Sequence, residues 1–283
     1  MSLPLDHIVI AVQDLERTIA DYQSLGFNVL RGGEHPGRST HNALVVFADG
    51  VYFELIAWRA PAPEERWWQQ LQQHGEGLVD FALLPTETGA VVAAAQARGL
   101  GYEAPYEGGR LRPDGEQLRW RNARAHSQDL PFLCGDLTPR ALRVPEGQVR
   151  VHPNGATGVA RLEVAVKDLQ ASLARWRALL GEGVDVSALR VSADGSTQQV
   201  SLGLGTTELV LAAPVQAAGF LAQRLATRGE GPYAIVLSVP QQAVARELDE
   251  VATHGVRIEL ALHSGSERET AAEALGAGQN VRD

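Results

Sequence analysis

The sequence repeats itself at an offset of 154 residues, and this duplication limits the folds that the chain can adopt. Residues 5–15 read LDHIVIAVQDL and residues 159–169 read VARLEVAVKDL, so in both copies an apolar run is followed by Asp-Leu. The Glu-Leu pair that starts at Glu54 recurs at Glu208. Self-similarity at a fixed offset indicates that one supersecondary unit is used more than once.

Each copy has the same predicted order of elements. In the first copy, the alternating apolar run of residues 7–12 is typical of a half-buried strand, and Asp14 suits the N-cap of the helix that follows. Further strands are predicted over FNVLRGG, HNALVVF and VYFELIAW, and an Asp-Gly turn joins the last two. The unit is therefore βαβββ.

A weaker copy of this unit begins at Leu78, at an offset of 73 from the first. LVDFALLP takes the place of LDHIVIAV, a helix is predicted over residues 86–100, and strands are predicted over YEAPYEGGRL, EQLRWRNA and LPFLCGD. In the second half, the strand YAIVLSVP and a helix predicted over residues 241–255 start a fourth copy. No alternating strand pair follows VRIELALH, so this fourth module is predicted to be incomplete.

These units predict an α+β fold of tandem βαβββ modules arranged as two cup-shaped domains. The first domain is expected over residues 1–140 and the second over residues 157–283. A linker rich in Pro, Gly and Asn joins them over residues 141–156.

Composition and charge exclude several classes of function. The net charge of −9 at pH 7 and the lack of a basic cluster argue against nucleic acid as a partner. No apolar run approaches the roughly 20 residues that span a membrane, and the N-terminus does not have the pattern of a signal peptide. We therefore expect a cytoplasmic protein with no membrane partner. Cys134 is the only cysteine, so no internal disulfide can form.

An acidic residue inside an apolar strand gives the first indication of a site. Two βαβββ units side by side make a cup lined by alternate strand residues, and His7 and Glu54 fall on that face. A glutamate is costly to bury unless it is paired or metal-bound, so Glu54 needs a partner. Asp80 aligns with His7 at the offset of 73. These three side chains are predicted to converge as ligands of a divalent ion.

Four further residues are candidates for the pocket. His41 opens the strand HNALVVF and is a candidate for a fourth ligand or a general base, and Asn42 follows it as a polar pocket residue. Tyr52 and Trp120 are candidates for its apolar walls.

Each predicted ligand also has a purely structural alternative. His7 could be a core histidine bonded to a neighbouring strand, and Glu54 could form an ion pair with Arg119 or Arg121. Asp80 could accept a hydrogen bond from a backbone amide.

The tandem βαβββ order, the opening LDHIVIAVQDL, the loop GGEHPGRSTHN and the strand YFELIAW resemble the vicinal oxygen chelate superfamily. Within it, the chain is similar to proteins with a glyoxalase-like domain, which share the glyoxalase/bleomycin-resistance/dihydroxybiphenyl-dioxygenase fold. The resemblance covers nearly all of the first half and, less closely, the second. It implies that two modules build one site for a divalent ion such as Zn, Fe, Mn or Ni. The ligands that it implies are His7, Glu54 and Asp80.

Two classes of function follow. The first is a glyoxalase-like enzyme of the lyase or isomerase type, in which the ion polarises a small hydroxycarbonyl or thiol-adduct substrate and Glu54 or His41 moves the proton. The second is a metal-free protein that binds or sequesters a small molecule between Trp120 and Tyr52. An extradiol dioxygenase is less favoured, because it would need two histidines and one carboxylate. A homodimer is compatible with each class.

The second half keeps Glu208 but has Arg161 where the first half has His7. A guanidinium cannot ligate a divalent cation, whereas it can form an ion pair with a carboxylate in the same cup. We therefore predict that the second half is a duplicated scaffold without a site. The chemistry is expected in residues 1–140.

Overall fold

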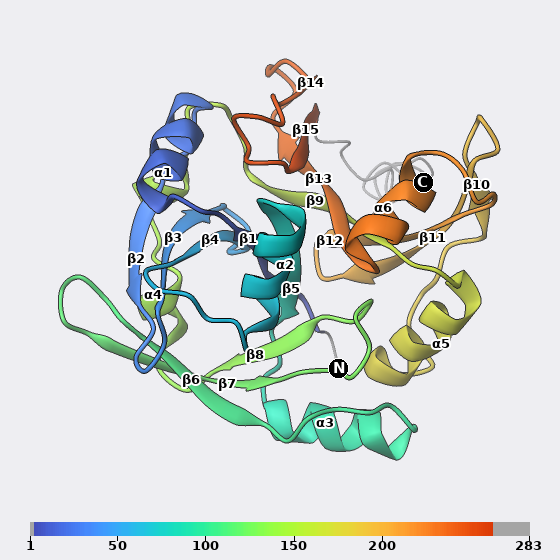
Figure 1. Ribbon diagram of the computed structural model, residues 1–283, viewed down its shortest axis with the longest axis horizontal. Helices are drawn as coiled ribbons and strands as arrows, with labels where there is room; N and C mark the ends of the chain where they lie inside the picture. Colours follow the sequence, from blue (N-terminus) through green and yellow to red (C-terminus); the bar gives the residue numbers. More distant parts are fainter. Residues whose placement is uncertain (1–2, 263–283) are drawn as a thin grey trace, which may run out of the picture.

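The computed structural model describes residues 3–262 of the chain, and their first half forms a closed barrel (Figure 1). Its strands are β1 (Leu5–Ala11), β2 (Leu30–Glu34), β3 (Thr40–Val46), β4 (Tyr52–Trp58), β5 (Gly77–Leu83), β6 (Tyr106–Leu111), β7 (Gln117–Ala123) and β8 (Phe132–Asp136). Its helices are α1 (Leu15–Ser24), α2 (Arg66–His74) and α3 (Thr88–Ala97). The strand order around the barrel is β1-β4-β3-β2-β6-β7-β8-β5. Two βαβββ modules thus close the predicted first cup.

The second half forms an open sheet of seven strands in the order β10-β11-β12-β9-β13-β15-β14. The strands are β9 (Gly158–Ala165), β10 (Arg190–Val191), β11 (Thr197–Leu204), β12 (Thr207–Pro214), β13 (Gly231–Val239), β14 (Arg246–Glu247) and β15 (Arg257–Leu262). The helices are α5 (Leu169–Leu180) and α6 (Phe220–Arg228). The third module is complete, and the fourth contributes β13 to β15. The segment after residue 262, on which the prediction of an incomplete fourth module depends, lies outside the described residues.

The helix predicted over residues 241–255 is wrong, because this segment adds to a sheet edge instead. The short strand β14 pairs antiparallel with β15, and the N–H of Leu248 donates to the carbonyl of Ile258. The apolar residues Val244 and Val251 of the expected helical face are 74% and 78% exposed. Leu248 is the one buried residue among Val244, Leu248 and Val251, so backbone pairing with β15 decides the conformation.

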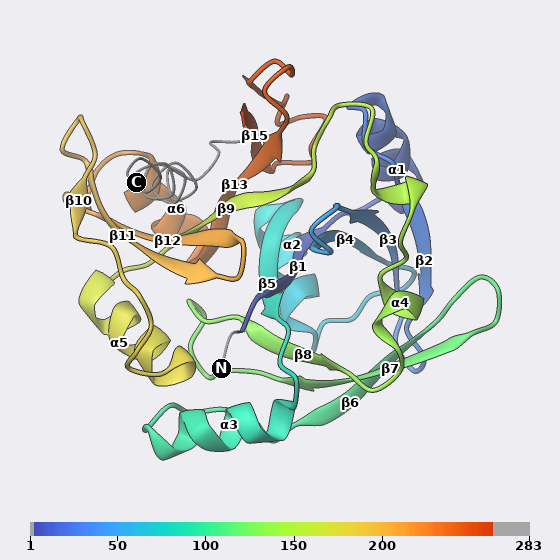
Figure 2. The ribbon, with the colours of Figure 1, turned by 180° about the vertical axis from the view of Figure 1, so that it is seen from behind.

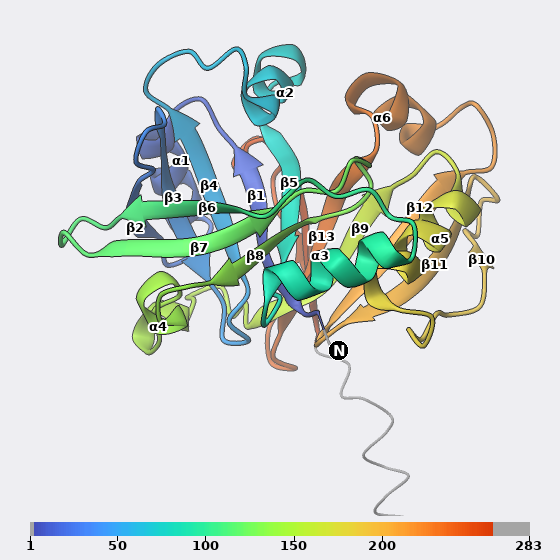
Figure 3. The same cartoon turned by 90° about the horizontal axis from the view of Figure 1, so that it is seen from below.

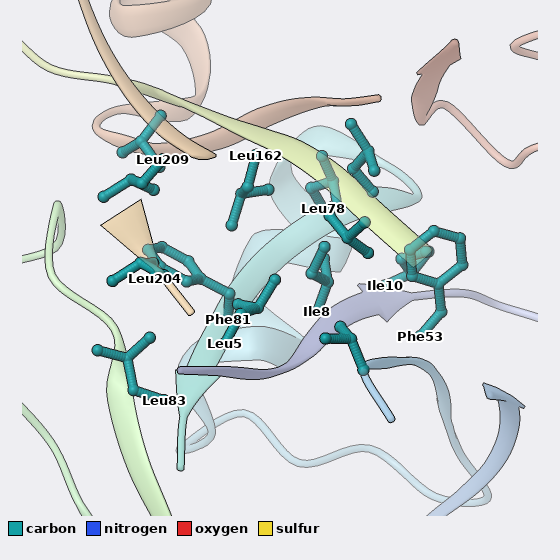
Figure 4. Close-up of a cluster of buried hydrophobic side chains, with 14 of the residues drawn as sticks. Leu5, Ile8, Ile10, Phe53, Leu78, Phe81, Leu83, Leu162, Leu204 and Leu209 are labelled. Atoms are coloured by element: carbon teal, nitrogen blue, oxygen red, sulfur yellow. The ribbon is translucent and has the colours of Figure 1, made fainter. Parts of the chain in front are cut away.

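The two halves share one hydrophobic core, which lies between the barrel and the open sheet (Figure 4). Ile8 and Ile10 alternate with inward-facing residues along β1 and point out of the barrel, as Phe81 does on β5. They pack with side chains of the second sheet that include Leu162 and Leu209. The ring of Phe81 also stacks on Trp176 of α5. Neither half therefore buries its apolar face alone.

The helices follow the internal duplication as well. Helix α2 begins at Arg66 and α6 begins at Phe220, which is the same offset of 154 residues that relates the strands. These two helices lie at the same end of the molecule (Figure 3), and α3 and α5 lie next to each other on another side (Figure 2). Among residues 3–262, no helix has the length and the apolar character needed to cross a bilayer.

The segment between the halves is packed against the barrel. It holds α4 (Arg140–Arg143) and a 3₁₀ turn (Gln148–Arg150), and Arg143 is 3% exposed. Further along, Nδ1 of His152 accepts a hydrogen bond from the backbone N–H of Asn28, and its Nε2–H donates to the carbonyl of Val46. This connection therefore contributes side chains to the first half as well as linking it to the second.

Candidate functional site

A cavity of about 280 Å³ opens inside the barrel. The inward-facing positions of several strands line it, because alternate residues of a strand face the same side of the sheet. These positions include the predicted residues His7, Asn42, Tyr52, Glu54 and Trp120. The aromatic rings of Trp67 and Phe132 complete an apolar part of the wall.

Glu54 is the centre of a polar group on one side of this cavity. Its Oε1 accepts a hydrogen bond of 2.6 Å from Nδ2 of Asn42. The Nε2 atom of His7 lies 3.6 Å from Oε2, and the Nε2 atom of His35 lies 3.6 Å from Oε1. A nearly buried carboxylate thus lies between two imidazoles, with one oxygen atom fixed by an amide.

His7 is oriented by the residue that precedes it. Its Nδ1 lies 2.7 Å from Oδ2 of Asp6. The same oxygen accepts a hydrogen bond from Arg143, and Oδ1 of Asp6 accepts one from Arg140. Burial alone would raise the pKa of Asp6, but the charges of Arg143, His7 and Arg140 outweigh it and hold this pKa well below its usual range. Because an ionised carboxylate only accepts hydrogen bonds, Nδ1 of His7 carries a proton. In the neutral imidazole, Nε2 then presents a lone pair towards Glu54.

Tyr52 supports His7 from the neighbouring strand and forms part of the wall. The two rings are stacked with centroids 4.7 Å apart. The Tyr52 hydroxyl oxygen accepts a hydrogen bond of 2.7 Å from Nη1 of Arg143. Tyr52 therefore lines the cavity, but its ring face is occupied by an imidazole.

His41 lies outside the cavity, which corrects its prediction as a ligand or base. On β3 the flanking residues Thr40 and Asn42 face inward, so the side chain between them faces outward. His41 pairs with Glu34 across the β2–β3 ladder. Burial, together with the charge of Arg59, lowers the pKa of His41.

His35 is the cavity histidine that the sequence did not reveal. It lies in the GGEHPGRSTHN loop, with Nδ1 2.9 Å from Oγ1 of Thr40 and Nε2 directed towards Glu54. Burial lowers the pKa of His35, which favours its neutral form. The alternation rule applies only to strands, and His35 follows the end of β2, so only its place in the quoted loop pointed to it.

Asp80 is separated from His7 and Glu54, and this corrects its prediction as a third ligand. Its carboxylate accepts hydrogen bonds of 2.7 Å from Arg66, 2.9 Å from Arg124 and 2.9 Å from the Trp67 indole. The ring of Phe132 contacts both His7 and the Arg124 guanidinium. The oxygens of Asp80 are thus already engaged on the far side of that ring.

The register of the barrel shows why the alignment misplaced this ligand. In the antiparallel β1–β5 pair, His7 lies opposite Ala82, and Asp80 lies opposite Val9. Asp80 is therefore displaced by two residues from the position that faces His7. A shift of two residues preserves the alternation of faces, so the periodicity cannot detect it.

The second module consequently lacks the ligands that a shared metal site would need. Ala82 lies opposite His7, and the last strand β8 presents Phe132 and Cys134 to the cavity instead of a carboxylate. Burial raises the pKa of the Cys134 thiol, which keeps it protonated. Of the described residues, only Asp6, His7 and Cys134 bring three potential ligand atoms within 4.8 Å of one another, and Asp6 is already held by two arginines. The donor set does not fit the predicted three-ligand site.

In the second half, the predicted ion pair is confirmed. Nε of Arg161 lies 3.2 Å from Oε2 of Glu208, at the positions that correspond to His7 and Glu54. Both side chains are more than 40% exposed, because the open sheet does not close over them.

The family model described as a glyoxalase-like domain matches residues 5–180, more than half of the chain. The chain therefore belongs to the glyoxalase-like domain family. Its modules have the fold of the vicinal oxygen chelate superfamily, as the sequence predicted. No curated protein matches the sequence.

Two solved structures show the same arrangement over nearly the whole chain. A hypothetical protein from Staphylococcus aureus has a TM-score of 0.70 at 14% identity, covering 92% of this chain and 100% of that one. A mutant of 4-hydroxymandelate synthase from Streptomyces coelicolor has a TM-score of 0.68 at 13% identity, covering 94% of each chain. At such identities the likeness shows the fold alone.

Proposed function

We propose that the barrel binds a small hydroxycarbonyl compound and that Glu54 transfers a proton on it without a metal ion. The main support is that the second module places Ala82 opposite His7 and presents Phe132 and Cys134 to the cavity, where a metal site would need an imidazole or a carboxylate. His7 and Glu54 remain as a pair in a cavity whose size suits a small molecule. The metal-dependent activity predicted from the resemblance would have to rely on this pair.

The geometry around Glu54 supports a role as general base. Asn42 fixes one carboxylate oxygen, and the other is directed towards Nε2 of His7 at a distance of 3.6 Å, which leaves both atoms free of a close hydrogen bond with each other. A carboxylate in a partly enclosed cavity can remove the proton of a carbon that adjoins a carbonyl and return it to the neighbouring carbon. The lone pair of His7 Nε2 can accept the proton of the adjacent substrate hydroxyl and return it to the former carbonyl oxygen, so that the hydroxyl and carbonyl groups change places.

A second candidate function is binding without chemistry, and the aromatic wall favours it. Trp67, Trp120 and Phe132 give the cavity apolar surface that a planar ligand could contact. In this case Glu54 and His7 would serve as hydrogen-bond partners alone.

Solvent deuterium exchange tests the proposal. We expect protein treated with EDTA to exchange the carbon-bound protons of dihydroxyacetone or hydroxypyruvate in D₂O, followed by NMR. Glu54→Gln should lower the exchange rate by about 100-fold or more, which is the usual contribution of a general base. The matched control is Glu208→Gln, which changes the corresponding glutamate of the second half and should leave the rate unchanged.

Two results would overturn this proposal. One is exchange that disappears with EDTA and returns with an added divalent ion, supported by elemental analysis that finds one equivalent of metal lost in His7→Ala. The other is binding of these compounds with no exchange, which would favour the second candidate.

A further inference from the structure

Arg110 is a buried guanidinium in the cavity wall that has no carboxylate partner among residues 3–262. It lies on β6, is 4% exposed and lines the cavity. Its Nη1 and Nη2 atoms donate only long hydrogen bonds of 3.4 Å, to the side-chain oxygen of Asn42 and the carbonyl of Arg143. Its Nε has no hydrogen-bond partner within residues 3–262.

The other arginines that line the cavity are all paired. Arg143 is bound by Asp6 and Asp136, Arg124 by Asp80, Arg119 by Glu107, and Arg38 lies 3.9 Å from Glu65. An unpaired buried charge is costly, because the cation has lost its hydration shell without gaining an opposite charge. Arg110 is therefore the cavity cation, among the described residues, whose partner is missing from the protein itself.

The backbone at Gly32 leaves room for the Arg110 guanidinium near Glu54. A Cβ atom at Gly32 would lie 2.0 Å from Oδ1 of Asn42 and 2.7 Å from Nη1 of Arg110, so any larger residue there would displace these two side chains. Asn42 connects the two charged groups, since its oxygen accepts from Arg110 and its Nδ2 donates to Glu54. A ligand group bound by Arg110 would thus lie one side chain away from Glu54.

We propose that Arg110 is the receptor for a substrate carboxylate, so that the ligand of the barrel is a small hydroxy- or oxo-carboxylate. A guanidinium matches a carboxylate with two parallel hydrogen bonds, which would satisfy donors that are now weakly bonded or unbonded. Glu54 is not within ion-pairing distance of this guanidinium, because Asn42 lies between them and is hydrogen-bonded to both. This inference rests on the proposed function of the cavity and specifies its substrate class.

A matched pair of probes tests the inference by calorimetric titration of EDTA-treated protein. Hydroxypyruvate and dihydroxyacetone share a hydroxymethyl ketone, but only hydroxypyruvate carries a carboxylate. We expect the wild type to bind hydroxypyruvate about 10- to 100-fold more tightly, the range given by charge-assisted hydrogen bonds. Arg110→Gln should remove this preference. Arg112→Gln should keep it, because Arg112 lies outside the cavity and pairs with Asp114.

The readouts separate a binding role of Arg110 from a structural one and from the proposed chemistry. Since no carboxylate in the described part of the chain pairs with Arg110, Arg110→Gln should leave the unfolding temperature unchanged or higher, whereas a structural role predicts a lower one. Glu54→Gln should lower the exchange rate by about 100-fold or more and keep the preference for hydroxypyruvate. Absence of exchange in the wild type, with this preference intact, would refute the proposed function alone. Equal affinity for the two probes, no binding of hydroxypyruvate, or a preference that survives in Arg110→Gln would refute the inference.

Discussion

His7 is held in place by residues far from it in the chain. Asp6 fixes its Nδ1, and Asp6 is in turn held by Arg140 and Arg143 from the segment that follows the barrel. Arg143 also bonds the hydroxyl of Tyr52, whose ring stacks on His7. The imidazole is thus fixed on its ring face and at one nitrogen, so that its other nitrogen keeps one direction. Such support is typical of residues whose geometry matters for chemistry.

His152 is expected to make stability depend on pH. Its Nδ1 accepts from Asn28 and its Nε2–H donates to Val46, so the folded state binds the neutral ring, and burial lowers the pKa of His152. The unfolded chain therefore takes up the proton at higher pH. The stabilisation is complete above the ordinary histidine pKa of about 6.5 and is lost as pH falls through the lowered pKa.

Substitution of His152 tests this pH dependence of stability. We expect His152→Gln to reduce the free energy of unfolding by about 2 kcal/mol at pH 8, through the loss of two buried hydrogen bonds, and by clearly less at pH 5. Urea denaturation at the two pH values measures both differences. A deficit that stays constant with pH would contradict this role.

At the scale of single residues, the sequence predicted the inward positions and missed the others for distinct physical reasons. His7, Asn42, Tyr52, Glu54 and Trp120 line the cavity because strand alternation determines which face a side chain occupies. The same alternation excludes His41, which the sequence nevertheless proposed from its residue type. The prediction for Asp80 was wrong because Asp80 is displaced by two residues from the position opposite His7. His35 was missed because it lies in a loop. Neither error is visible without coordinates.

Asp80 has a role at the scale of elements, since it fastens α2 to the barrel. It joins Arg66 and Trp67 of this helix to Arg124, which follows β7. We expect Asp80→Asn to reduce the free energy of unfolding by about 3 kcal/mol, because it leaves two arginines without their buried partner. Amide hydrogen exchange should also become faster in residues 66–74.

A surface pair provides the control for this change. Glu16→Gln removes an exposed ion pair with Arg31 and should cost less than about 1 kcal/mol. If Asp80→Asn released a bound metal ion and left stability unchanged, the original assignment of Asp80 as a ligand would be restored.

The elements themselves were predictable where a buried face sets a clear period. The strands β1 and β4 and the helices α1 and α3 occur where the pattern placed them. The segment 241–255 has a helical pattern, but Val244 and Val251 of its apolar face are exposed. Its strand pairing with β15 depends on a neighbour that is close only in the folded chain.

At the scale of the whole molecule, the shared core should make the two halves unfold together. Leu162 of the second sheet is fully buried against residues of the barrel. We expect Leu162→Ala to reduce the free energy of unfolding by about 3 kcal/mol and to lower one common calorimetric transition. Val244→Ala, at a 74% exposed position, should change it by less than about 0.5 kcal/mol. Two separate transitions, with only one of them shifted, would show independent halves.

The duplication thus predicted the modules but not their degree of closure. The first half closes into a barrel because β2 meets β6 through the pair Glu34–Leu111, and within residues 3–262 the second half has no corresponding contact. Closure also accounts for the different environments of Glu54, which is 7% exposed, and of its exposed counterpart Glu208.

The connection after β8 has a consequence for how such chains can be rearranged. Arg143 donates hydrogen bonds to Asp6 and Tyr52, and His152 donates one to the carbonyl of Val46 at the end of β3. Neither Arg143 nor His152 belongs to a strand of the barrel or of the open sheet. A recombination that exchanged the second half at residue 140 would leave every strand of the barrel intact. It would nevertheless remove Arg143, which holds Asp6 and Tyr52 against His7. The unit that such an exchange must preserve extends through His152.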